Sequence, residues 1–256
     1  MTAPSFAPAP AAAPRSRMLA AQVAMEFKLL LRNGEQVGLT LVIPLLLLFF
    51  FNLPLLYKLN TPRRIDFVVP SMIALAVMSA AFTGLAIGTG FERKYSVLKR
   101  LGATALPRSV LILGKTLSVL LLELVQLVLI CGLGLALAWH PQVNPVPAVL
   151  LVVLGTVAFG GLGLLVAGTL RAEITLAAVN LIWLILLFAG GIAIPLDKYG
   201  RTANDILQYL PSAALSDGLH QVLQQSAGGW PIRDVVTLLV WAAVALPAAA
   251  RWFRWE

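Results

Sequence analysis

Residues 110–138 read VLILGKTLSVLLLELVQLVLICGLGLALA, and only Lys115 and Glu123 in this run carry a charge. An apolar run of about 18 residues or more lets a helix cross the hydrocarbon core of a bilayer. This run is longer than a bilayer needs, so its helix is expected to tilt or to project beyond the membrane. The stretch therefore predicts an integral membrane protein rather than a soluble domain.

Five further apolar blocks are distributed along the chain. Of its 256 residues, 59% are hydrophobic and 12% are charged, whereas a soluble domain has about 25% charged residues. The further blocks lie at 38–56, 67–90, 148–170, 174–195 and 232–250. Together with 110–138 they predict an all-α membrane protein with six transmembrane helices.

The region before the first block has two parts. Residues 1–15 are rich in Ala and Pro and are expected to form a disordered tail ahead of one transmembrane domain, 16–256. Residues 16–35 predict a helix that lies in the membrane interface or, as the alternative, caps the helix bundle. Its apolar face holds Leu19, Val23, Phe27 and Leu30, and its charged face holds Arg17, Lys28, Arg32 and Glu35.

The distribution of basic residues predicts the orientation of the chain. Most of the nineteen Lys and Arg residues fall on the side that also holds both termini and residues 91–109. Basic residues accumulate on the cytoplasmic side of membrane proteins, so both termini are expected in the cytoplasm and the spans in the inner membrane. The net charge of +8 is attributed to this bias and to lipid headgroups, not to nucleic acid.

Residues 109–116, SVLILGKT, resemble the phosphate loop G-x-x-x-x-G-K-[ST] but lack its essential features. Ser109 replaces the first glycine, and apolar side chains fill the loop positions. We therefore expect no nucleotide here, and we expect Lys115 to reach out to lipid headgroups.

His140 and His220 have no metal-ligand partner at helical spacing and are expected to be solvated, so neither a metal site nor a catalytic group is predicted.

Four side chains within the predicted spans are candidates for a pathway or a conformational switch. Glu123 lies deep in the third span, where a charge costs about 3 kcal/mol, and Gln126 is close enough along the helix to hydrogen-bond with it. A polar clamp between two helices explains this pair as well. Asn180 and Trp183 interrupt the aliphatic fifth span, where they line a pathway or pack against a neighbouring helix.

The second span carries small residues at every fourth position: Ala76, Ala80, Gly84 and Gly88. Small residues let two helices approach closely. The ladder indicates packing within the chain or, alternatively, a dimer seam or a sliding helix.

Two segments between the spans also show helical periodicity. Residues 91–101 predict a short cationic helix on the inner surface, ended by Leu106-Pro107, with Phe91, Tyr95 and Leu98 on one face. Residues 196–231 follow the helix-breaking stretch GGIAIPL at 190–196 and predict a re-entrant helical segment on the outer side. The expected buried stripe of that segment is Leu215, Leu219 and Val222.

These residues carry a family resemblance. Two groups of motifs resemble the permease subunits of the type-2 ATP-binding-cassette (ABC) exporter family, and together they cover most of the chain. The first is Glu92-Arg93, Tyr95, Leu98-Lys99, Leu101, Ala103-Thr104, Leu106-Pro107-Arg108 and Gly114-Lys115; the second is Leu210-Pro211 with Asp217 and Leu219. The chain departs from the family at Ser96-Val97, where Gly-Thr is common, and at His220, where arginine is frequent.

The resemblance implies how such a chain works. Residues 91–101 would be a coupling helix seated in a separate ATPase subunit, which would hold ATP and Mg, so that this chain carries no cofactor. A second permease subunit, identical or homologous, would complete the pathway for a drug, a lipid or a lipid-linked glycan. The implied ATPase-coupling residues are Phe91, Glu92, Arg93, Tyr95, Leu98, Lys99 and Leu101.

Two other functions fit a chain of this composition. A secondary active transporter would work without an ATPase, but the spans hold few acids and show no inverted repeat. A membrane-bound enzyme would need a catalytic constellation, and the sequence shows none. Expulsion of a hydrophobic or amphiphilic substrate with energy from a partner ATPase is therefore the function we expect.

Overall fold

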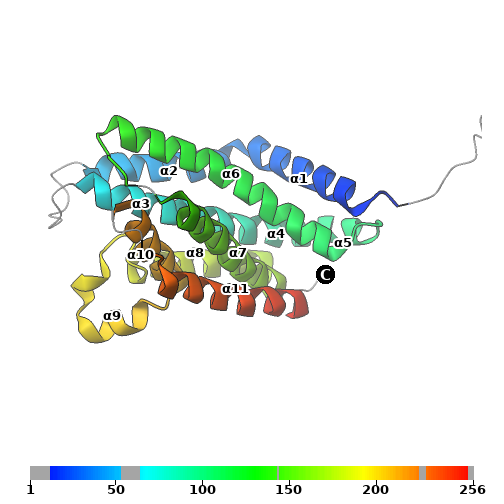
Figure 1. Cartoon of the computed structure of the whole chain (residues 1–256). Coiled ribbons are helices and arrows are strands. Elements are labelled where there is room, and N and C mark those ends of the chain that lie inside the picture. The colour runs from blue at the N-terminus through cyan, green and yellow to red at the C-terminus, as the bar shows by residue number, and fades with distance from the viewer. Residues whose placement is uncertain (1–11, 53–63, 143, 225–228, 253–256) are drawn as a thin grey trace, which may run out of the picture.

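The computed structural model describes residues 12–52, 64–142, 144–224 and 229–252, and these residues form helices without a strand. The helices are α1 (Arg15–Arg32), α2 (Gly34–Asn52), α3 (Arg64–Val77), η1 (Met78–Gly84), α4 (Leu85–Lys94), α5 (Val97–Gly102), α6 (Arg108–Ala136), α7 (Pro145–Thr169), α8 (Ala172–Ala189), η2 (Leu196–Tyr199), α9 (Arg201–Leu207), α10 (Pro211–Gln224) and α11 (Ile232–Trp252) (Figure 1). The predicted all-α fold is confirmed.

Five helical segments in this part of the chain are long and apolar enough to cross a membrane. They are Arg64–Lys94, Arg108–Ala136, Pro145–Thr169, Ala172–Ala189 and Ile232–Trp252. The first predicted block, 38–56, contains only a shorter apolar stretch, Thr40–Phe51, within α2. The end of that block lies outside the described residues, so a sixth span remains a prediction.

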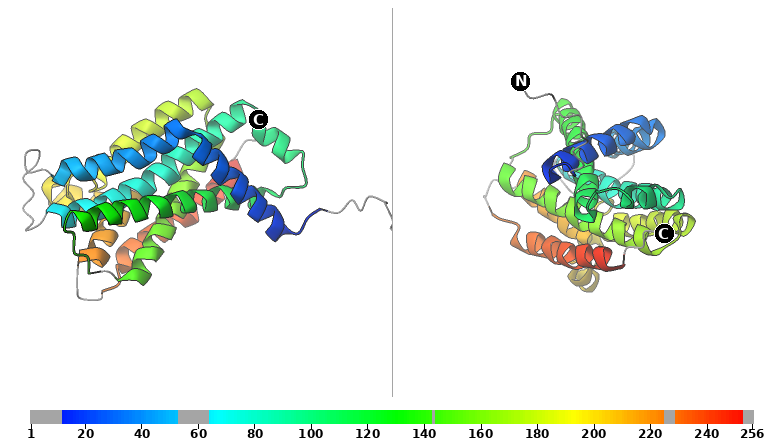
Figure 2. Two further views of the ribbon diagram at one scale, coloured as in Figure 1. Left: turned by 90° about the horizontal axis from the view of Figure 1, so that it is seen from above. Right: turned by 90° about the vertical axis from the view of Figure 1, so that its right-hand side faces the viewer.

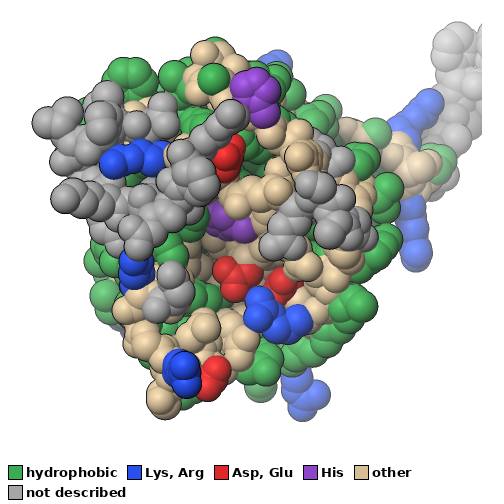
Figure 3. Space-filling view, turned by 60° about the vertical axis from the view of Figure 1, so that its left-hand side comes forward, with side chains coloured by type: hydrophobic (Ala, Val, Ile, Leu, Met, Phe, Trp, Pro, Cys, Tyr) green, Lys and Arg blue, Asp and Glu red, His purple; other side chains and the backbone are tan. Residues whose placement is uncertain are grey.

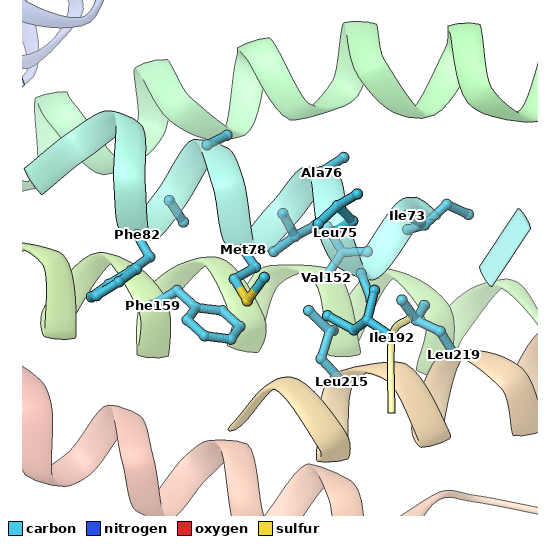
Figure 4. Packing of buried hydrophobic residues seen from close by; sticks show 14 of the residues in the cluster. Ile73, Leu75, Ala76, Met78, Phe82, Val152, Phe159, Ile192, Leu215 and Leu219 are labelled. Atoms are coloured by element: carbon cyan, nitrogen blue, oxygen red, sulfur yellow. The ribbon is translucent and has the colours of Figure 1, made fainter. Parts of the chain in front are cut away.

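The continuous segment formed by α3, η1 and α4 is the centre of the bundle. It is the most buried of the five spans, because α2, α6, α7, α8 and α10 all pack around it. Figure 4 shows Met78 and Phe82 of η1 against Phe159 of α7, all almost fully inaccessible to solvent. The core therefore depends on apolar contacts between helices that are distant in the sequence.

The middle of this central segment is a π-helix, which changes the register of the small-residue ladder. A π-turn holds more residues than an α-turn, so side chains four apart no longer lie directly above one another. Ala76 and Ala80 are buried, whereas a Cβ atom at Gly88 would meet nothing within 4 Å. Within this chain the four residues therefore do not form one packed contact, and a dimer seam stays a prediction.

The two ends of the bundle differ in structure. The start of α1, the α5 helix and the end of α11 lie together at one end, and α9 and α10 lie at the other (Figures 1 and 2). The predicted re-entrant segment consists of η2, α9 and α10. Helix α10 packs against α3, α7 and α11 through the buried side chains of Leu215, Leu219 and Val222.

Candidate functional site

A groove of about 970 Å³ runs along the central segment between α2 and α8. A volume of this size suits a drug-sized or amphiphilic ligand. Hydroxyl, amide and aromatic side chains interrupt its apolar walls. The lining residues are Asn33, Thr40, Ile43, Pro44, Leu75, Ser79, Thr83, Gly84, Ile87, Gly88, Phe91, Glu92, Tyr95, Val97, Leu176, Asn180 and Trp183.

Asn180 and Trp183 both face this groove from α8. The indole Nε1 of Trp183 donates a hydrogen bond to Ser79 Oγ of η1 at 3.0 Å, which fixes the ring against the central segment. Asn180 is exposed rather than packed against another helix of the chain. Trp183 thus packs against the core while it also lines the groove. A role of either residue in a pathway stays a prediction.

Glu123 and Gln126 lie in the packed bundle and do not line the groove. Thr156 of α7 donates a hydrogen bond to Glu123 Oε2 at 2.5 Å. Gln126 donates to the carbonyl oxygen of Thr40 in α2 at 2.9 Å, and not to Glu123 as the spacing suggested. The two side chains thus link α6 to two different helices, which corresponds to the polar clamp.

Lys115 does not extend to lipid headgroups, contrary to the prediction. Only 4% of the residue is exposed, and its Nζ lies 2.9 Å from Glu26 Oε1 of α1 and 2.6 Å from Glu92 Oε2 of α4. Gln22 of α1 donates a further hydrogen bond to Glu26 at 2.8 Å. We call Glu26, Glu92 and Lys115 the charged triad; it joins α1, α4 and α6.

Close contact between α1 and α6 makes the charged triad possible. A Cβ atom at Gly114 would stand 2.5 Å from Gln22 Cγ, so glycine is required where α1 crosses α6 (Figure 2). The sequence held a signal for this contact, since Gln22 and Glu26 interrupt the apolar face formed by Leu19, Val23 and Phe27. That face therefore packs toward the bundle. Its two polar residues, Gln22 and Glu26, are the buried residues of α1.

The predicted single helix over 91–101 is wrong. Helix α4 ends at Lys94, and α5 begins at Val97 after a turn in which Ser96 has φ 58° and ψ 22°, the left-handed conformation. The stripe of Phe91, Tyr95 and Leu98 is therefore split between two helices. The chain turns here because a left-handed residue cannot continue a right-handed helix.

The candidate coupling residues also divide into two groups. Leu98 is fully buried against the bundle, so it is not a surface contact, and Leu101 is half-buried. Arg93 donates to the carbonyl oxygens of Ala167 at 2.6 Å and Leu170 at 2.8 Å, at the end of α7. Exposed side chains of the turn and of α5 are those of Tyr95, Ser96, Val97, Lys99 and Arg100.

We expect Ser96→Gly to raise the free energy of unfolding by about 1 kcal/mol. The left-handed conformation costs an L-residue about 1–2 kcal/mol, whereas glycine adopts it freely. Denaturant unfolding in detergent measures the change. The matched substitution Ser96→Val is expected to lower the same free energy, and a stabilising Ser96→Val would contradict this account of the turn.

The end of the bundle that holds α10 carries a separate polar pocket of about 260 Å³, lined by Asp217, His220, Gln221, Gln224, Arg233 and Asp234. Figure 3 shows charged and histidine side chains gathered around a hollow at this end. Arg233 of α11 bonds to Asp217 at 3.2 Å and to Asp234 at 2.7 Å. Burial nevertheless raises the pKa of Asp217 above its ordinary value, against the opposing effect of Arg233.

His220 in this pocket is not solvated, which corrects the prediction. Its ring lies 4.7 Å from that of Phe67, with Nδ1 2.7 Å from the Ser216 carbonyl oxygen and Nε2 3.0 Å from that of Phe67. A neutral imidazole donates to only one of these two acceptors. Burial lowers the pKa of His220 below 6.5, although both backbone hydrogen bonds act in the opposite direction.

The lowered pKa of His220 predicts that acid destabilises the fold. As the pH falls below 6.5, the unfolded chain takes up a proton that the folded chain does not, so the free energy of unfolding decreases. His220→Gln removes this contribution. Unfolding temperatures at neutral and mildly acidic pH should therefore fall more steeply for the wild type than for His220→Gln, and equal slopes would contradict the prediction.

Most of the chain matches a known protein family. A family model described as "ABC-2 family transporter protein" matches residues 64–251. This stretch runs from the start of α3 into the last turn of α11. It covers the five span-length segments except Trp252, and it includes the turn before α5 and α10. No curated protein gives a significant match to the chain.

Proposed function

The chain belongs to the ABC-2 family of transporter proteins, and on this basis we propose that it is the permease subunit of an ATP-driven exporter. The groove beside the central segment is the path of a hydrophobic or amphiphilic substrate. A separate ATPase subunit, which holds ATP and Mg, supplies the energy. The observation that carries this proposal is that one groove contains both candidate pathway residues and the residues that lead into α5.

The connection between α4 and α5 is the mechanical element of the proposal. Phe91, Glu92 and Tyr95 line one end of the groove, and the chain passes directly from them into α5. Arg93 and the ion pair between Lys94 and Glu173, 2.5 Å long, hold the end of α4 against the α7–α8 connection. A push on α5 therefore changes the width of the groove.

The ATPase binds at the end of the bundle that carries α5. Its contacts there are the exposed side chains of Lys99 and Arg100, and those of Tyr95 and Val97 at the edge that they share with the groove. Leu98 anchors α5 to the bundle. This end of the bundle and both termini face the cytoplasm. Helix α2 provides the sixth span of the inner membrane. A second permease subunit closes the groove.

Substitutions in the groove test the proposal. Trp183→Ala and Asn180→Ala are each expected to lower substrate export about tenfold, the effect of ~1.4 kcal/mol of lost binding. Co-purification with the ATPase should be unaffected, because both side chains lie away from α5. Ile185→Ala on the same helix is the control, since Ile185 is exposed outside the groove. Export unchanged in both groove variants would refute the pathway.

A further inference from the structure

The charges around the groove indicate which amphiphiles it accepts. We propose that the groove selects a cationic headgroup through Glu92, so that a cationic amphiphile is the substrate class. This inference rests on the proposed function, because it assumes that the groove holds the transported molecule.

The groove wall is deficient in positive charge. Among the described residues that line it there is no Lys, Arg or His, and Glu92 is the one acidic side chain. The nearest cation, Lys115, lies behind the wall and is bonded to Glu92 at 2.6 Å and to Glu26 at 2.9 Å. Lys94 lies 5.8 Å from the Phe91 ring centre and 5.9 Å from that of Tyr95, and it is paired with Glu173 at 2.5 Å. Arg93 is held by the carbonyl oxygens at the end of α7.

The charged triad behind the wall has an excess of negative charge. It contains two carboxylates and one ammonium, and Lys115 bonds to both acids. A small cavity of about 50 Å³ next to the triad is also lined by Glu92, so this side chain stands between that cavity and the groove. The Glu92 side chain is 23% exposed but that of Glu26 is only 9% exposed. Glu92 is therefore the more exposed of the two carboxylates and the one that faces the groove.

The surroundings of Glu92 suit an alkylated ammonium group. Phe91 and Tyr95 line the same end of the groove, with ring centres 6.3 Å apart. Aromatic faces attract alkylammonium groups, most strongly where water is excluded. Farther along, Ile43, Leu75 and Leu176 provide an apolar wall for a hydrocarbon tail.

Three amphiphiles with the same tail test this inference: dodecyltrimethylammonium, dodecyl maltoside and dodecyl sulfate. Binding is measured on the complex with its ATPase in nanodiscs of uncharged lipid. We expect the ammonium compound to bind at least about tenfold more tightly than the sulfate. Glu92→Gln should abolish this preference, because it removes the carboxylate from the groove wall. Glu123→Gln, the same change at a buried acid outside the groove, should preserve it.

If the Glu92→Gln protein does not fold, Glu26→Gln provides a second test of the same inference. It removes the excess charge from behind the groove without changing the lining, and the preference should decrease. Equal binding of the ammonium and the sulfate to the wild type would overturn the inference, while ATP-driven export of the maltoside would leave the proposed function intact. If none of the three compounds binds or is exported, the proposed function fails as well.

Discussion

Replacing Lys115 with methionine is expected to lower the free energy of unfolding by roughly 3–5 kcal/mol. The ammonium of Lys115 is the partner of two acids, Glu26 and Glu92, in a site where the lysine is 4% exposed. Without it, two carboxylates face each other with little water to separate them. Breaking a buried ion pair in this way is far more costly than losing a surface pair, because an uncompensated charge remains.

Denaturant unfolding in detergent measures this loss of stability, and two further variants serve as controls. Lys94→Met breaks the exposed pair with Glu173 and should leave the unfolding transition close to that of the wild type. The triple variant Lys115→Met, Glu26→Leu, Glu92→Leu removes all the buried charge and should recover most of the stability. A Lys115→Met protein as stable as the wild type would mean that the charged triad does not exist.

Gly190→Ala is expected to destabilise the fold by about 3 kcal/mol. Gly190 follows α8, where that helix meets α10. A Cβ atom here would overlap Ser212 Oγ and the Leu186 carbonyl oxygen, and would stand 2.5 Å from Ser212 Cβ. The Leu186 carbonyl oxygen is backbone of the last turn of α8, and Ser212 Cβ does not move when the hydroxyl rotates. A side-chain rotation therefore does not relieve the clash, and both the end of α8 and its contact with α10 must shift.

Thermal unfolding in detergent, compared with that of two other variants, tests the Gly190 prediction. Gly132→Ala in α6 is the control: a Cβ atom there meets nothing within 4 Å, so the helix should gain about 0.5–1 kcal/mol. Combining Gly190→Ala with Ser212→Gly should recover part of the loss, because two of the three nearest atoms belong to Ser212. A Gly190→Ala protein that unfolds like the wild type would contradict the close packing of α8 on α10.

Five of the six predicted spans correspond to helices long and apolar enough to cross a membrane, because length and apolarity are the main requirements for a transmembrane helix. The blocks at 110–138 and 148–170 correspond closely to α6 and α7. The buried stripe of Leu215, Leu219 and Val222 is likewise apparent from spacing. Span length and a buried apolar stripe are properties of one helix, so the sequence of that helix is sufficient to predict them.

The remaining features depend on contacts between distant helices. The position of Lys115 in the sequence is compatible with a side chain that extends to lipid headgroups and with one that pairs with two acids. Only the crossing of α1 over α6 determines which of these contacts forms. The break at Ser96 occurs at a residue that does not interrupt helical periodicity. Asn180 and Glu123 similarly look alike as polar residues within apolar spans, yet one lines the groove and the other packs against α7.

The most direct test of the central claim is the energy source of transport. Proteoliposomes that contain this chain and its ATPase partner should accumulate an amphiphilic fluorescent probe when ATP is added, and not with a non-hydrolysable analogue. Trp183→Ala should reduce this accumulation about tenfold. Accumulation driven by an ion gradient without ATP, or by this chain without the ATPase, would contradict the account and identify a secondary transporter.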